Sequence, residues 1–384
     1  MRRTGRVPAP VWLKPILVTV IDAPPPGFQT VGQYAAQRVA RHAAERGRGG
    51  RTLLIHGPPG AGKTAFVDDL LALAFCTDAD LGRRPCNACR GCRDARARTH
   101  PDLVIGSPGS WRDSRSTGES IVAVARRWLL DAAGAPVVGA RRVVLIERAD
   151  DANEQIQNAL LKALEEPTDR HVYLLVADEP SKLLPTIRSR CQPLRIGPVP
   201  REELVSLLMD RRPLPADLAE SLATLAGGLP GLALRYADDK AALEWRSAVQ
   251  RELLGLLERD RAERFGAIGD LLAEADRLEA APRQPSEGDE ARLAPSAQRG
   301  AAVRVVGAWL GLTRDLLVAA AGRPELAPSG ELAPEIDRLA RRIGTRPLVA
   351  MVKTLEHMHD GLRENAAPRL TLEVGMLAWP RVER

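Results

Sequence analysis

Long apolar runs are absent from this chain of 384 residues. No stretch approaches the roughly 18 uninterrupted apolar residues that a membrane span requires. The first residues, MRRTGRVPAPVWLKPILVTVI, begin like a secretory signal, but Lys14 and Pro15 interrupt the apolar part and no small-residue cleavage site follows. We therefore expect a cytoplasmic protein with no membrane partner.

Cysteine is scarce and unevenly placed. The chain has five cysteines, and four of them lie between Cys76 and Cys92. A disulfide framework would spread its cysteines along the chain, so this pattern argues against that class and agrees with a reducing compartment. An internal repeat is also missing from the sequence.

Length and charge set broad limits. A chain of 384 residues exceeds the usual size of one hydrophobic core, so we expect two or three domains. Lys and Arg number 55 against 49 Asp and Glu, which gives a net charge of +6. This balance mildly favours an anionic partner such as nucleic acid. The alternative is a general compositional bias toward Ala, Arg, Gly and Pro.

The segment from Thr52 to Pro200 alternates short apolar runs with helical patterns, which predicts a parallel sheet flanked by helices. In NEQIQNALLKALEEP, apolar residues recur at helical spacing and Pro167 ends the helix, so its inner face should lie on the sheet. The expected strands are TLLIH (52–56), DLVIG (102–106), RVVLIE (142–147) and HVYLLVA (171–177).

Beyond Pro198 the pattern is helical almost to the C-terminus. PREELVSLLMDRR and PADLAESLATLAGG predict a short helical unit that ends at Gly227 and Gly228. A longer helical region begins near Ala241, and its Pro-, Ser- and charge-rich stretch at 280–300 predicts a mobile loop.

A phosphate-binding loop is the strongest motif. GPPGAGKT lies directly between an expected strand and an expected helix, which is the context that the motif needs. Its glycines let main-chain N–H groups surround phosphates, its lysine reaches the β and γ oxygens, and the threonine hydroxyl can ligate magnesium. The alternative is a glycine-rich turn that binds nothing. The candidate residues are Gly57, Pro58, Pro59, Gly60, Ala61, Gly62, Lys63 and Thr64.

The clustered cysteines predict a structural zinc site. Cys76, Cys86, Cys89 and Cys92 contain two C-x-x-C steps and one longer gap, which suits tetrahedral zinc. Four thiolates would leave no open position for catalysis. A redox pair or unligated thiols are the alternatives, although redox chemistry normally needs only two cysteines.

Several motifs together resemble the bacterial DNA polymerase III clamp-loader family of AAA+ proteins. After the phosphate loop and the cysteine cluster come THPDL (99–103), NALLKALEEP (158–167) and TIRSRC (186–191), and VGQ (31–33) is similar to the family's adenine-side box. The resemblance covers residues 27 to about 235 and implies an α/β RecA-like domain, a small helical lid and an all-α collar that joins five subunits.

The resemblance also suggests domain boundaries. The expected parts are an N-terminal extension (1–26), a nucleotide-binding domain (27–197) with the cysteine insertion (76–92), a lid (198–240) and a collar (241–384). The implied partners are the γ/τ and δ subunits and, through the complex, the sliding clamp and primer–template DNA. The implied ligand is ATP or ADP with magnesium.

The end of the strand at 142–147 departs from the family's hydrolysing members. Those members carry an Asp that supports magnesium and a Glu that activates water, whereas this chain has Glu147 and Arg148. We keep Glu147 among the nucleotide-site residues. A guanidinium stays protonated and cannot act as a general base, so Arg148 cannot activate water. Asp150 lies two positions further on and is a weak substitute.

Two further departures concern the residues that sense the nucleotide. Gly231 stands where a hydrolysing member offers an arginine, and Arg235 lies about one helical turn beyond it. After the strand at 171–177, Ala177 and Asp178 stand in place of a threonine-bearing sensor. These changes affect hydrolysis, whereas the residues expected to bind nucleotide are intact. We therefore expect absent or weak ATPase activity in the chain itself.

Arg190, in the SRC motif, matches the arginine that clamp loaders deliver to a neighbouring subunit's nucleotide. Without the resemblance, a structural ion pair would be the favoured interpretation. Together these features imply a stator that completes a ring within the DNA polymerase III holoenzyme, a DNA-directed DNA polymerase. The rival hypotheses are a γ/τ-like ATPase, a branch-migration or helicase-loading module, and a zinc-stabilised scaffold without nucleotide.

Overall fold

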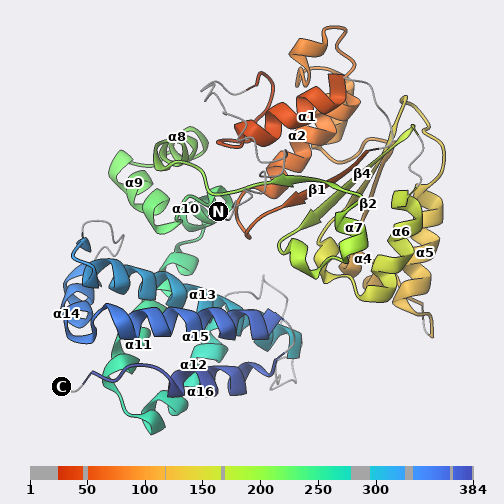
Figure 1. The fold of residues 1–384 in the computed structure, drawn as a ribbon. Helices are drawn as coiled ribbons and strands as arrows, with labels where there is room; N and C mark the ends of the chain where they lie inside the picture. Colours follow the sequence, from red (N-terminus) through yellow and green to blue (C-terminus); the bar gives the residue numbers. More distant parts are fainter. Residues whose placement is uncertain are drawn as a thin grey trace, which may run out of the picture. The chain divides into compact units, whose positions relative to one another are not determined.

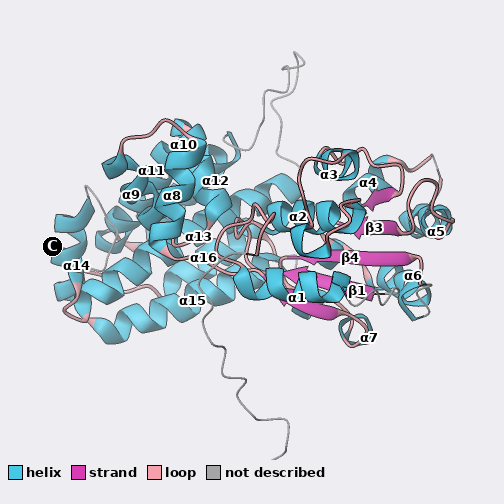
Figure 2. Cartoon of the chain, turned by 90° about the horizontal axis from the view of Figure 1, so that it is seen from above, coloured by secondary structure: helices cyan, strands magenta, loops and turns pink. Residues whose placement is uncertain are grey.

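The computed structural model describes residues 25–45, 51–116, 118–165, 169–277, 295–324, 332–363 and 366–382. The chain divides into two compact units, one built from residues 1–56 and 64–195, the other from 57–63 and 196–384. The first unit holds the sheet, and the second is helical in its described residues (Figures 1 and 2). None of the described helices combines the length and apolar character needed to cross a membrane.

The first unit contains a five-stranded parallel sheet in the order β2-β3-β4-β1-β5. The expected α/β class, a parallel sheet flanked by helices, is therefore confirmed. The four predicted strands are present within one residue at each end, and a fifth was missed. The strands are β1 (Arg51–His56), β2 (Leu103–Gly106), β3 (Arg142–Ile146), β4 (His171–Ala177) and β5 (Gln192–Arg195).

Successive strand residues point to opposite sides of the sheet, so a strand made of apolar residues presents apolar side chains on both faces. Helices cover both of these faces. Leu54, Val144 and Leu175 share one buried core with α5 and α6. Leu53, Val143 and Leu174 face the other side, where they line a small gap with residues of α1 and α2. The helices are α1 (Tyr34–Glu45), α2 (Lys63–Phe75), α3 (Arg90–Arg96), α4 (Pro108–Asp113), α5 (Ile121–Ala132), α6 (Glu154–Glu165) and α7 (Pro185–Arg188).

Helix α6 is the helix predicted within 153–167. Ile156, Leu160 and Leu164 recur at spacings of four and are buried, and they belong to the same core as the strand residues. Asn153 precedes the helix and its side chain accepts a hydrogen bond from the N–H of Ile156, which satisfies one free donor of the first turn. The inner face of this helix therefore packs on the sheet, as expected.

The second unit contains two groups of helices, each with its own core. Helices α8 (Arg201–Arg211), α9 (Ala216–Leu225) and α10 (Pro230–Asp238) bury a small cluster around Leu204, Leu208 and Leu222. A larger cluster around Trp309 unites the six helices that follow. These are α11 (Lys240–Glu258), α12 (Arg261–Arg277), α13 (Pro295–Ala320), α14 (Ala333–Ile343), α15 (Thr345–Arg363) and α16 (Pro368–Leu377).

The segment predicted to be a loop at 280–300 is shorter than expected at its C-terminal end. Helix α13 begins at Pro295, so residues 295–300 are helical and this part of the prediction is wrong. Proline suits the first turn of a helix because its missing N–H has no partner there. Residues 280–294, like 1–24 of the expected N-terminal extension, lie outside the described residues.

Candidate nucleotide site and metal centre

The phosphate loop joins the end of β1 to the start of α2. Gly60 and Gly62 have positive φ angles of 80° and 95°, which side-chain-bearing residues adopt only with strain. The amino group of Lys63 is buried and donates to the carbonyls of Gly57 (2.7 Å) and Pro58 (2.9 Å). Thr64 is exposed in the first turn of α2. The predicted residues thus form a loop whose conformation depends on glycine and which leads into a helix N-terminus. This arrangement is suited to binding phosphate.

Helix α10 contacts this loop within the same unit. The main-chain N–H of Gly231 donates to the carbonyl of Gly60 at 2.8 Å. A side chain at position 231 would place its Cβ 3.1 Å from the same oxygen, so only glycine allows this approach without adjustment. Arg235 lies beside Pro59 and Gly60 along a cavity of about 400 Å³. The expected sensor position therefore provides a main-chain contact in place of a guanidinium.

At the end of β3, position 148 holds an arginine, which cannot serve as a general base. Arg148 adopts a positive φ of 50°, and its side chain is 75% exposed and donates to Asp151 at 2.6 Å. Glu147 accepts a hydrogen bond from Arg98 at 2.7 Å, and Arg98 also binds Asp68 at 3.0 Å. Sequence reasoning did not identify Arg98, and no pattern in the sequence marks it.

The side chain of Asp150 accepts hydrogen bonds from the main chain after β4. Its carboxylate is 8% exposed and accepts hydrogen bonds from the N–H groups of Asp178 (3.0 Å) and Glu179 (2.8 Å). Burial raises the pKa of this carboxyl, although the hydrogen bond from Glu179 opposes the rise. Asp150 therefore organises the turn after β4, and it is not exposed as a carboxylate that could position water.

The four clustered cysteines converge as the spacing predicted. Cys76 follows α2, Cys86 and Cys89 lie in the next loop, and Cys92 belongs to α3. Their Sγ atoms all lie within 4.8 Å of one another. Zinc–sulfur bonds of about 2.3 Å place the sulfurs of a tetrahedron roughly 3.8 Å apart, so a small contraction would close the shell. The donor set fits zinc.

Main-chain N–H groups also point at these sulfurs. The N–H of Cys86 donates to Cys76, that of Cys89 to Cys86 and that of Cys92 to Cys89, each at 3.4 Å. Burial raises the pKa of Cys89, but hydrogen bonds from Thr77 and Cys92 outweigh it and lower the pKa to about 6. Burial raises the pKa of Cys92 well above its ordinary value. A divalent cation would favour the thiolate form at every position.

Arg190 lies at the surface just after α7. Its guanidinium donates to Glu165 of α6 at 2.9 Å and to the carbonyl of Thr186 at 3.0 Å. The two charged side chains are 36% and 49% exposed. Exposed pairs of this kind contribute about 0–1 kcal/mol, so another anion can compete for the arginine. The structure thus places Arg190 in an exposed ion pair with Glu165.

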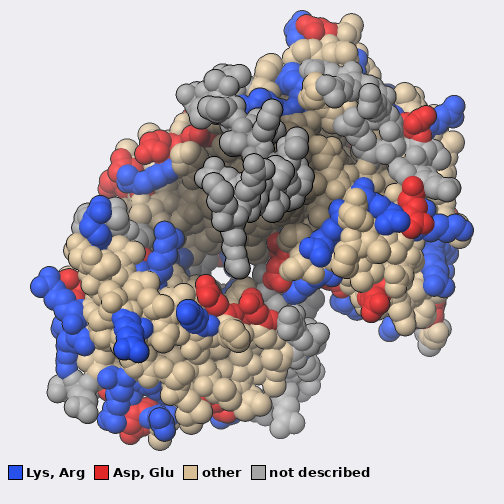
Figure 3. Space-filling view, viewed as in Figure 1, with Lys and Arg blue, Asp and Glu red and all other residues tan. Residues whose placement is uncertain are grey.

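The charge of the surface is mixed. In the view of Figure 3, Lys and Arg side chains are interspersed with Asp and Glu over the described surface. The small excess of basic residues therefore does not form one continuous basic band on this face.

Comparison with known proteins identifies relatives of part of the chain. Residues 32–200 match the family model described as DNA polymerase III, delta subunit. DNA polymerase III subunit delta′ of Pseudomonas aeruginosa is 36% identical over 190 residues, which cover 47% of this chain and 54% of that protein. The chain thus spans about half the length of the delta′ relative.

Two further similarities extend along more of the chain. The gamma/tau subunit of Mycobacterium tuberculosis DNA polymerase III is 29% identical over 367 residues, covering 90% of this chain and 59% of that protein. A solved gamma subunit-related protein from Thermotoga maritima has 16% identity and a TM-score of 0.41, covering 88% of this chain and 97% of that one. Residues 32–200 are thus similar to the delta and delta′ subunits of DNA polymerase III.

Proposed function

We propose that this chain is the δ′ subunit of a bacterial DNA polymerase III clamp loader. In this role it joins γ/τ and δ subunits in a five-membered ring in the cytoplasm, and the ring places the sliding clamp on primer–template DNA. Helices α8–α10 act as the lid and α11–α16 as the collar, while the four cysteines hold structural zinc.

The residues that follow β3 are the main support for this proposal. Arg148 occupies the position from which a carboxylate would activate water, and its guanidinium pairs with Asp151. Asp150, the nearest alternative, accepts two main-chain hydrogen bonds. In this proposal the chain holds ATP or ADP through Lys63 and Thr64, Glu147 is kept among the nucleotide-site residues, and hydrolysis is weak or absent.

Arg190 gives the stator its part in catalysis. Phosphoryl transfer develops negative charge on the γ-phosphate oxygens, and a guanidinium from a neighbouring subunit stabilises that charge only in the assembled ring. Such arginine fingers contribute roughly 10³ to 10⁵ in rate in well-studied cases. Arg190 is exposed and held by a weak surface pair, so it can exchange Glu165 for a phosphate.

The test uses the reconstituted complex with the clamp and primed DNA. Arg190→Ala is expected to lower stimulated ATP hydrolysis while zinc content and assembly stay normal. Arg190→Lys should rescue poorly, because a point charge does not reproduce the planar fork. Arg188→Ala, an exposed change on the same turn, is the matched control.

Glu165→Gln separates the two interpretations of Arg190. If Arg190 serves only its ion pair, removing the charge of Glu165 should reproduce the effect of Arg190→Ala. If Arg190 acts in trans, Glu165→Gln should leave hydrolysis unchanged or slightly faster, because a competing carboxylate is gone. Unchanged clamp loading by the Arg190→Ala complex would contradict the proposed mechanism.

A γ/τ-like ATPase is the second candidate. The similarity to a gamma/tau subunit over 367 residues and the intact phosphate loop favour it. Steady ATP turnover by the isolated chain, abolished by Lys63→Ala, would support this candidate over the stator.

A further inference from the structure

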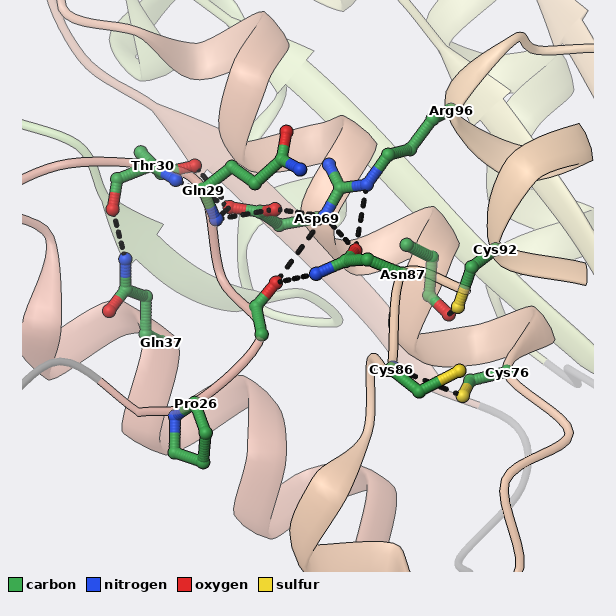
Figure 4. Close-up of polar contacts among 12 residues, drawn as sticks. Pro26, Gln29, Thr30, Gln37, Asp69, Cys76, Cys86, Asn87, Cys92 and Arg96 are labelled. Atoms are coloured by element: carbon green, nitrogen blue, oxygen red, sulfur yellow. Dashed lines mark hydrogen bonds and ion pairs between the residues drawn. The ribbon is translucent and has the colours of Figure 1, made fainter. Parts of the chain in front are cut away.

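A buried carboxylate ties the phosphate-loop helix to the segment before α1. Asp69, on α2, is fully buried and accepts hydrogen bonds from the main-chain N–H groups of Gln29 (3.0 Å) and Thr30 (2.8 Å), as well as from the Thr30 hydroxyl (Figure 4). A buried carboxylate needs several donors to offset the loss of water. These contacts hold residues 29 and 30 against the helix that begins at Lys63.

The charge of Asp69 is balanced by an arginine that lies four residues beyond the cysteine insertion. Arg96, at the end of α3, donates to Asp69 at 2.8 Å, and its side chain is 20% exposed. The same guanidinium donates twice to the side-chain oxygen of Asn87, at 2.9 and 2.6 Å. Cys92 lies one helical turn before Arg96 on α3. The arginine is therefore positioned by the element that carries one of the four thiols.

Asn87, in the turn between Cys86 and Cys89, connects the cysteine insertion to Gly27. Its side-chain amide donates to the carbonyl of Gly27 at 2.8 Å, and its φ is 58°. The two backbones approach so closely that a Cβ on Gly27 would lie 2.0 Å from the carbonyl oxygen of Pro85. The loop that presents the cysteines thus lies directly on residue 27.

The tethered segment also contacts the first turn of α2 and helix α1. Phe28 stacks on the buried Phe66, with ring centroids 6.5 Å apart, one turn after Lys63. The side chain of Gln37, on α1, donates to the carbonyl of Thr30 at 2.5 Å. Residues 27–30 are therefore fixed by α1, α2 and the cysteine insertion together, and they lead into Val31–Gln33.

We propose that the four-cysteine centre braces residues 27–33, so that closing the centre sets the affinity of the phosphate loop for nucleotide. This inference rests on the proposed nucleotide site. When the cysteines are held together, Asn87 and Arg96 are fixed and the segment is pinned to α2. When the centre opens, Asn87 leaves Gly27, and Asp69 loses its counter-ion in a buried position. The centre then acts beyond its own loop as a positioning element for nucleotide binding.

The first test changes the brace and leaves the metal ligands intact. Asn87→Gly removes the side chain without forcing a residue into the left-handed conformation. Arg93→Ala is the matched control, because Arg93 is exposed and donates to Ala88 within the insertion. Both full-length variants are expected to retain zinc by elemental analysis.

Two readouts decide the proposal. In Asn87→Gly, hydrogen exchange of residues 27–33 should accelerate, and a fluorescent ATP analogue should bind about tenfold more weakly, roughly the effect of one net hydrogen bond. In Arg93→Ala, both should match the parent chain. Exchange at 27–33 that equals the parent's in Asn87→Gly overturns the brace. Faster exchange with unchanged affinity overturns the link to nucleotide.

Removal of metal provides an independent arm. Full-length chain stripped with a chelator should show faster exchange at 27–33 as well as at 76–92, and added zinc should restore both. Faster exchange confined to 76–92 overturns the proposal. If the parent chain binds no nucleotide, the proposed nucleotide role fails, while the exchange measurements still decide whether the centre braces the segment.

Discussion

Asp315 should make the helical unit less stable as the pH rises. This carboxyl lies on α13 and is 6% exposed. Burial raises its pKa from 3.8 to about 6, although the charges of Arg246 and Arg314 oppose the rise. Between these two pKa values the folded state binds more protons than the unfolded state. The free energy of unfolding therefore falls as the pH rises through this interval, and levels off above it.

The size of the effect follows from the same values. Each pKa unit corresponds to about 1.4 kcal/mol, so a rise from 3.8 to about 6 represents about 3 kcal/mol above pH 7. Asp315→Asn removes the charge and keeps the shape. We expect the variant to exceed the parent chain in stability by up to about 3 kcal/mol at pH 7.5, with the difference shrinking toward pH 4.

Urea unfolding of the full chain, followed by circular dichroism at several pH values, measures this difference. Other carboxylates change the stability of both proteins alike, so the variant-minus-parent difference isolates Asp315. Asp360→Asn is the control, since that side chain is 75% exposed. A variant-minus-parent difference that does not change between pH 4 and pH 7.5 would refute the reasoning.

Three other predictions concern the first unit. Purified chain should carry about one zinc, and Cys89→Ser should loosen the insertion without abolishing nucleotide binding; elemental analysis that finds no metal would contradict the site. Arg148→Glu alone should not produce ATP turnover, because Gly231 and Asp178 also differ from hydrolysing subunits; a phosphate-release assay checks this. Asp102→Asn should lower stability by roughly 1.5–3 kcal/mol, because burial of Asp102 is outweighed by main-chain hydrogen bonds that lower its pKa. That stabilisation is present above pH 3.8 and is lost as the pH falls through the folded pKa.

The sequence predicted the three inner strands of the sheet, whereas it did not predict the outer strand β5. β1, β3 and β4 are apolar runs, as strands buried on both faces require. β5 reads QPLR, and of its four residues only Leu194 is buried. Proline and two polar residues give no strand signal, so only pairing with β1 makes this segment a strand.

Motifs in the sequence marked the residues of the candidate site, but they did not reveal the side-chain contacts that hold those residues in place. The phosphate loop and the cysteine cluster have fixed spacings that follow from backbone geometry, and they could be predicted. The pairs Arg98–Glu147 and Arg190–Glu165 join residues 49 and 25 positions apart. Local periodicity carries no information on such contacts. The same is true of Asp69, whose partners come from two other segments.

The edges of the sheet limit how this protein can meet another chain. The strand order leaves β2 and β5 as the outer strands, and each has four residues. β5 also contains Pro193, which has no N–H to donate. Short edges that include proline are poor templates for an added strand. In the proposed ring, neighbouring subunits are therefore expected to be recognised through side chains of helices and loops, so single surface substitutions would alter the choice of partner while the sheet stays intact.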